Sequence, residues 1–189
     1  MRKLLKKIAF LFIIATCVAI LFPAKVLEYE ALLIPSPQIP LIPRPQAIAI
    51  SIESIGVYAL IEHVGITGAA MAAPENSLDV GWYKYGVRPG DEGSAVLAGH
   101  VSGRGGKDAV FTNLHLIHVG DTITISYDDG SEESFTVKDM KQYPVISDTT
   151  EVFVSHDGKA HLNLITCAGV WSTAMGTHNL RLVVFADKI

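Results

Sequence analysis

The feature that most constrains the fold of this chain is a series of short apolar segments rich in β-branched residues. In several of them apolar and polar residues alternate with a period of two, which is typical of half-buried β-strands. No amphipathic stretch exceeds about a dozen residues, so any helices should be few and short. The segments are AIAISI at 47–52, GVYALIE at 56–62, SAVLAGH at 94–100, TITISY at 122–127, SFTVKDM at 134–140, AHLNLITC at 160–167 and LRLVVFA at 180–186.

The signals between these segments support an all-β domain. Asp128-Asp129-Gly130-Ser131 separates two of them and predicts a β-hairpin. Asn76–Lys84 is a candidate for one short helix. Seven or eight short strands within roughly 140 residues predict a β-barrel or a β-sandwich.

The N-terminal residues 1–27 have the character of a membrane segment. Four basic residues precede the apolar run Ile8–Phe22, whose 15 residues would span roughly 22 Å as a helix, short of the ~30 Å hydrocarbon core. Flanking lysines such as Lys25 can extend this reach. We therefore expect a single-pass anchor with a cytoplasmic N-terminus and an extracellular domain. A cleaved signal peptide, which would give a secreted protein, is the alternative.

Residues 28–46 form a proline-rich linker, and residues 47–189 form the domain. Five prolines within Leu33–Gln46 exclude a helix and favour polyproline II. At ~3.1 Å per residue such a linker is a semi-rigid spacer between membrane and domain. The alternative is a strand-like arm that lies on the domain surface.

Charge and cysteine content argue against nucleic-acid binding and draw attention to one thiol. From Ala47 onward, 9 basic and 17 acidic residues give a net charge of −8, so the domain lacks the basic patch of a nucleic-acid-binding protein. Cys17 lies in the apolar N-terminal run and Cys167 in the domain, so a disulfide between them is not expected. An unpaired thiol in an exported domain suggests reactivity. A buried structural cysteine is the alternative.

Three residues at predicted strand ends could act together. Cys167 ends the apolar segment NLITC, His100 ends SAVLAGH, and Arg181 begins the last segment. A thiol nucleophile needs a base or cation beside it and donors for the oxyanion that forms on the attacked carbonyl. Each residue alone has a structural explanation, but together they indicate thiol catalysis. His178, close to Arg181 in sequence, is the rival to His100 as base.

The motifs around these residues are similar to those of the sortases. Leu164-Ile165-Thr166-Cys167 resembles the TLxTC signature of that family, with Asn163 in the place of its first Thr. Ala98-Gly99-His100 resembles the A-G-H segment, and Arg181-Leu182-Val183-Val184 resembles the R-[KL]-[IVL]-[FV] strand. The resemblance covers essentially the whole domain.

Three further motifs are most similar to those of the single-domain class F sortases. They are Asp79-Val80-Gly81-Trp82-Tyr83, Arg88-Pro89-Gly90 and Gly93-Ser94-Ala95-Val96. One departure is His100-Val101-Ser102, where many relatives carry His-Val-Asp. The acidic set that binds calcium in some relatives is not evident, so neither a metal nor another cofactor is implied.

The resemblance implies a mostly β fold, a closed eight-stranded barrel with a few short helices. It also implies a transpeptidase in which the Cys167 thiolate attacks the Thr–Gly carbonyl of an LPxTG-like sorting signal on an exported protein. His100 would protonate the leaving amine, and Arg181 would stabilise the oxyanion. An amine on a peptidoglycan precursor or a pilin would then accept the acyl group.

The resemblance further implies that Thr166 and Ala168 contact the substrate, the latter through the N–H groups that follow Cys167. Thr166 is equally well explained as a structural strand residue.

Two other functions fit the same residues. One is a secreted thiol hydrolase or peptidase, although papain-like enzymes place the Cys before the His and L,D-transpeptidases place the two close together. The other is a non-catalytic extracellular β module that binds a peptide. A zinc site is not predicted, because His115 and His118 lack partners at a recognisable spacing.

Overall fold

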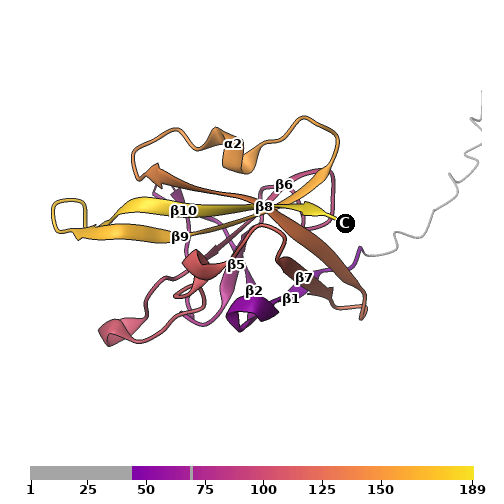
Figure 1. Cartoon of the computed structure of the whole chain (residues 1–189), viewed down its shortest axis with the longest axis horizontal. Coiled ribbons are helices and arrows are strands. Elements are labelled where there is room, and N and C mark those ends of the chain that lie inside the picture. The colour runs from indigo at the N-terminus through magenta and orange to yellow at the C-terminus, as the bar shows by residue number, and fades with distance from the viewer. Residues whose placement is uncertain (1–43, 69) are drawn as a thin grey trace, which may run out of the picture. The chain divides into compact units, whose positions relative to one another are not determined.

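Eight strands close into a β-barrel in the computed structural model, which describes residues 44–68 and 70–189 (Figure 1). Around the barrel the order is β1-β2-β5-β6-β9-β10-β8-β7. Neighbours pair antiparallel except β2 with β5 and β6 with β9, which are parallel. The barrel strands are β1 (Ala47–Ile52), β2 (Val57–Val64), β5 (Val80–Tyr83), β6 (Gly93–Gly99), β7 (Thr122–Tyr127), β8 (Glu132–Pro144), β9 (Ala160–Ser172) and β10 (Thr177–Lys188).

The predicted fold class is confirmed, and the sandwich alternative is wrong. Each of the seven apolar segments lies in a barrel strand except for the end residues Gly56 and His100, and β7 and β8 are joined through the predicted hairpin turn at residues 128–131. In the part of the chain that the structure describes, the elements outside the barrel are short. They are the hairpin of β3 (Ile66–Thr67) and β4 (Ala70–Met71), the helix α2 (Thr150–Phe153), and 3₁₀ turns at Glu53–Ile55, Arg104–Gly106 and Leu114–Leu116.

The predicted helix over Asn76–Lys84 is wrong. Residues 76–79 form a turn, closed by a hydrogen bond from the Asp79 N–H to the Asn76 carbonyl, and Val80–Tyr83 form β5. Gly81 explains the difference, because glycine disfavours a helix interior and here lets β5 approach the Val64 side chain closely. Val80 is completely buried in the barrel.

Side chains of β9 and β10 alternate between an inner face, toward the barrel interior, and an outer face of the barrel wall. Leu162 and Leu164 of β9, together with Leu182 and Val184 of β10, point into the barrel and belong to its main core. The residues between them point outward, as the two-residue period of a strand requires. Beyond the barrel the two strands continue as a ribbon whose turn projects past the other strands (Figure 1).

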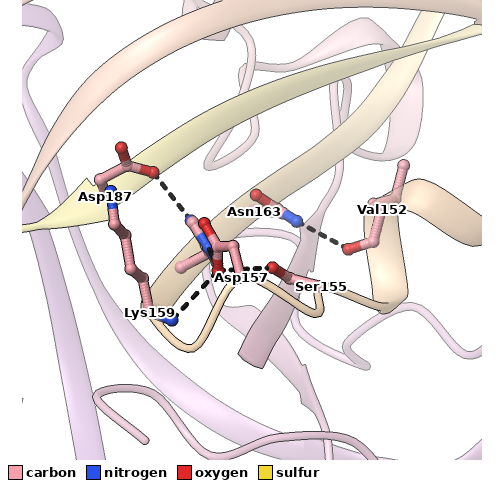
Figure 2. Close-up of polar contacts among 7 residues, drawn as sticks. Val152, Ser155, Asp157, Lys159, Asn163 and Asp187 are labelled. Carbon is pink, nitrogen blue, oxygen red and sulfur yellow. Dashed lines mark hydrogen bonds and ion pairs between the residues drawn. The ribbon is translucent and has the colours of Figure 1, made fainter. Parts of the chain in front are cut away.

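A second, smaller core lies on the outer face. Val96 of β6 and Val183 of β10 pack with Val152 of α2, so this helix covers part of the barrel wall. Asn163, only 2% exposed, donates its side-chain N–H to the Val152 carbonyl at 2.7 Å (Figure 2). Asn163 therefore attaches α2 to β9 through a buried hydrogen bond.

A charged cluster fixes the loop between α2 and β9. The His161 ring lies 2.9 Å from Asp157 in the loop and 2.8 Å from Asp187 of β10. Asp157 also accepts hydrogen bonds from the Ser155 hydroxyl and the Lys159 N–H (Figure 2). The contact with His161 and then these bonds hold the pKa of Asp157 well below its usual range. Burial opposes the charged form of His161, but the two carboxylates outweigh it and raise the His161 pKa.

The N-terminal predictions stay untested. The anchor at residues 1–27 lies outside the described residues, as does the linker at residues 28–46 apart from its last three. Over residues 44–68 and 70–189, no helix combines the length and apolar character that crossing a bilayer requires.

Replacing Asn163 by Ala should destabilise the domain by about 1–3 kcal/mol, because the buried Val152 carbonyl would lose its partner. Urea unfolding of the variant and the wild type measures this difference. As a control, Asn113→Ala removes an amide for which the described residues show no side-chain hydrogen bond, and it should change stability much less. Equal losses in the two variants would contradict the role given to Asn163.

The cluster at His161 should make stability depend on pH. A raised His161 pKa means that its contribution is complete below the ordinary value of 6.5 and is lost as pH rises through the folded-state pKa. The lowered Asp157 pKa adds stability above 3.8 that is lost as pH falls further. The stability difference between wild type and His161→Gln should therefore be largest between these two values. A difference in unfolding free energy that stays constant from pH 4 to pH 9 would contradict this.

Candidate functional site

Cys167 and Arg181 lie directly opposite each other on neighbouring strands. They are register partners in the antiparallel pairing of β9 with β10. Ile165, two residues before Cys167, and Val183, two residues after Arg181, belong to the outer core. The period of two therefore places the Cys167 and Arg181 side chains on that same outer face.

His100 joins this face from the neighbouring strand on the other side. It follows β6 directly, and β6 pairs with β9 so that Ala98 lies beside Ile165. Val96, four residues before His100, is part of the outer core. Although 67 residues separate His100 from Cys167 in the chain, the three predicted site residues come from the adjacent strands β6, β9 and β10.

The predicted positions within the strands need correction. His100 is the first residue after its strand, whereas Cys167 and Arg181 lie inside β9 and β10 rather than at an end and a start. The ribbon beyond the barrel accounts for this, because pairs such as His178 with Trp171 extend both strands. Just after Cys167 the ribbon has a register shift, at which Gly169 adopts a φ of +75° and the Val170 N–H donates to the Asn179 side chain.

Several hydrogen bonds fix His100. The Thr166 hydroxyl donates to the Gly99 carbonyl at 2.7 Å, and the His100 carbonyl accepts from the Phe111 N–H at 2.9 Å. The ring nitrogen Nε2 lies 3.0 Å from the Pro74 carbonyl. Gly99 is required here because any Cβ at this position would overlap the Phe111 ring. His100 is thus held at both its backbone and its ring.

The guanidinium of Arg181 is held by the first residues of β10. Its Nη1 group donates to the carbonyls of His178 and Leu180 at 3.0 and 2.9 Å, and Nη2 donates to Thr177 Oγ1 at 3.1 Å. These contacts leave the Nε–H and one Nη2–H without a partner among the described residues. A fixed cation with two free donors beside a thiol is suited to binding an anionic oxygen.

Tyr143 is a neighbour of Arg181 that sequence reasoning missed. It pairs with Arg181 from β8, on the side opposite to Cys167. Its hydroxyl donates to Glu151 of α2. Burial and then this hydrogen bond raise the Tyr143 pKa, so the phenol stays neutral. Tyr143, Arg181 and Cys167 lie side by side across three neighbouring strands. The motifs do not encode the pairing of β8 with β10, so the sequence could not place Tyr143 there.

The half-buried Cys167 is the free cysteine of the described residues and opens on a pocket of about 240 Å³. The predicted residues Thr166 and Ala168 also line this pocket, together with the rival base His178, whereas His100 and Arg181 do not. His178 packs edge-on against Trp171 at a centroid distance of 5.5 Å. Lining residues that sequence reasoning did not assign to the site are Val101, Phe111, Thr112, His115, Gln142, Gly169 and Leu182.

Two other observations concern residues outside this candidate site. In the part of the chain that the structure describes, no three His, Cys, Asp or Glu side chains converge so as to hold a metal ion. A hollow of about 270 Å³ near Trp82, Arg88 and Tyr127 contains none of the predicted site residues. Neither observation adds a residue to the candidate site, which consists of Cys167, Arg181 and His100 on the outer face, with the pocket beside Cys167.

Replacing Thr166 by Val should cost about 1–3 kcal/mol of unfolding free energy, because Thr166 is only 4% exposed and the Gly99 carbonyl would lose its bond. Thr166→Ser keeps the hydroxyl and should retain most of the stability. Chemical denaturation of both variants measures the contrast. If the Val variant, which keeps the methyl group, is as stable as the wild type, the hydroxyl does not hold β6 to β9.

Comparison with known proteins agrees with this geometry. A family model described as "Sortase domain" matches residues 50–189. The comparison with curated proteins gives no match.

Among solved structures, sortase C1 from Streptococcus agalactiae is 22% identical with a TM-score of 0.59, over 75% of this chain and 66% of that chain. Sortase C-1 from Actinomyces oris is 24% identical with a TM-score of 0.60, over 75% and 72%. A lid mutant of sortase A from Corynebacterium diphtheriae is 22% identical with a TM-score of 0.59, over 79% and 74%. These likenesses show the fold, and the family model covers most of the chain. The chain therefore belongs to the sortase family, a family of cysteine transpeptidases.

Proposed function

We propose that this protein is an extracytoplasmic transpeptidase that cleaves an LPxTG-like sorting signal between Thr and Gly and transfers the acyl group to an amine. The observation that carries the proposal is the placement of Cys167 and Arg181 as cross-strand partners, with His100 after the adjacent strand on the same outer face. Within the family we propose the single-domain class F, on the motifs at residues 79–83, 88–90 and 93–96.

In the first half-reaction the Cys167 thiolate attacks the Thr carbonyl carbon of the sorting signal. A C–S bond forms, and the carbonyl electron pair moves to the oxygen. The Nε–H and the remaining Nη2–H of Arg181 donate to this oxyanion, as do the backbone N–H groups of Ala168 and Gly169. When the intermediate collapses, the C–N bond breaks and the His100 imidazolium gives its proton to the leaving Gly amine. A thioester on Cys167 remains.

In the second half-reaction an amine attacks the thioester. It loses a proton to His100 as the new C–N bond forms, and the C–S bond breaks to return the thiolate. Thr166 supports this arrangement by holding the end of β6 to β9 next to Cys167. Water in place of the amine gives slow hydrolysis. A secreted thiol hydrolase would show that outcome alone, and a peptide-binding module would show neither.

Residues 1–27 are proposed to anchor the chain in the cell membrane with the N-terminus inside, and residues 28–46 to hold the catalytic domain away from the bilayer. The substrates are then exported proteins with a C-terminal sorting signal. The acceptor amine belongs to a peptidoglycan precursor or a pilin. A sortase that is 26% identical to this chain is named for a pilus island of group B Streptococcus, which makes the pilin worth testing first.

The test uses the full chain in mild detergent with a panel of LPxTG-type peptides, with and without an added oligoglycine or a pilin-derived lysine peptide. Mass spectrometry should detect an acyl adduct on Cys167 and a Thr–amine product. Cys167→Ala should remove the adduct and lower product formation by about 10³-fold or more, because the nucleophile is lost.

Cys17→Ala is the matched control, since it removes the other thiol of the chain and should leave both adduct and product in place. Hydrolysis without amine transfer in the wild type would favour the thiol hydrolase. A folded protein that forms neither adduct nor product over the whole panel would overturn the proposal.

A further inference from the structure

The Pro74 carbonyl lies 3.0 Å from Nε2 of His100, although 26 residues separate the two in the chain. A carbonyl oxygen only accepts hydrogen bonds, so in this contact Nε2 carries a proton. Nδ1 is then the nitrogen of the ring that can lose and regain a proton. The peptide group between Pro74 and Glu75 thus decides which end of His100 exchanges protons.

That peptide group is itself held by a carboxylate from β2. Glu62 Oε2 accepts the N–H of Glu75 at 3.0 Å, and Oε1 accepts the N–H of Asn76 at 3.3 Å. In a trans peptide the C=O and the N–H point in opposite directions. Glu62 therefore binds one side of the Pro74–Glu75 peptide, and His100 binds the other side. The negative charge on the N–H side also polarises the carbonyl as an acceptor.

The rest of the loop is fixed independently of Glu62. Asn76 accepts the Leu78 N–H at 3.1 Å and donates to Asp79 at 2.8 Å, while the Ser77 carbonyl accepts the Val110 N–H at 2.9 Å. These bonds anchor the loop on the side that follows Asn76. At the Pro74–Glu75 peptide, the Glu75 N–H donates to Glu62, which is its acceptor among the described residues.

We propose that Glu62 is a positioning residue: by holding the Pro74–Glu75 peptide, it keeps the Nε2–H of His100 in place and leaves Nδ1 to exchange the proton. This role deepens the proposed function and rests on it for its effect on the reaction. The hydrogen-bond chain from Glu62 to His100 does not depend on it, so the two can be tested separately.

The first measurement uses no substrate. Full-length protein is labelled with ¹⁵N at histidine, and long-range ¹H–¹⁵N spectra are recorded in alkaline buffer, with His100→Gln assigning the ring signals. The wild type should show a protonated Nε2, an unprotonated Nδ1 and a slowly exchanging Hε2. In Glu62→Gln the amide oxygen can accept one N–H, while its NH₂ group faces the other donor. The Hε2 signal should therefore exchange with water and disappear.

A matched control and a graded variant make this result specific. Asp128→Asn changes another carboxylate that accepts a distant backbone N–H, from Gln46 at 2.8 Å, and it should leave the His100 signals unchanged. Glu62→Asp keeps both oxygens on a shorter side chain and should give a signal between those of the wild type and Glu62→Gln. A persistent Hε2 in folded Glu62→Gln, or its equal loss in Asp128→Asn, would overturn the proposal.

The second measurement is transpeptidation by the same variants. Glu62→Gln should lower kcat about 10- to 100-fold, because a misplaced proton donor slows the chemistry. KM should change little, since Glu62 is not proposed to touch the peptide. If Glu62→Gln loses the Hε2 signal but keeps the wild-type kcat, the proposed effect of Glu62 on the reaction is wrong. An inactive wild type with an intact Hε2 would instead count against the proposed function and leave the Glu62 contact standing.

Discussion

The register between β9 and β10 is the constraint on which the rest of the molecule depends. It places Cys167 opposite Arg181 and, on the other face, puts Leu164 and Leu182 into the barrel. A slip by one residue would turn every side chain of one strand to the wrong face. Because β6 and β8 pair on either side, the same register also determines where His100 and Tyr143 lie. Core packing and site geometry are therefore specified by one set of hydrogen bonds.

Much of the fold follows from the sequence because alternation is a local property. Segments such as 122–127 carry apolar residues at every second position, and Asp128–Ser131 has the composition of a tight turn. β5 escaped this reasoning because four residues that include Gly81 are too few to establish a period. Barrel closure is also not local. The residues alone left barrel and sandwich open, and the resemblance to sortases decided between them.

The site residues were predicted from motifs, but their contacts were not. The strand-end positions of His100 and Cys167 suggested that the two act together, but the sequence does not show that β6 lies beside β9. The contacts of His100 with Pro74 and of Arg181 with His178 and Leu180 involve backbone carbonyls, which leave no trace in side-chain identity. At Asn163 the structure explains a feature of the sequence. This residue replaces the first Thr of the family signature, and its buried side chain donates a hydrogen bond to the Val152 carbonyl of α2.

The outward placement of Cys167 and Arg181 puts both side chains on the same face as the second core. Residues of one parity in β9 and β10 face the barrel interior, whereas the other parity includes the completely buried Val183 as well as Cys167 and Arg181. The two functions still meet at one residue, because Leu182 belongs to the main core and also lines the pocket at Cys167. Laboratory evolution at Leu182 would therefore have to select for stability and for activity at the same time.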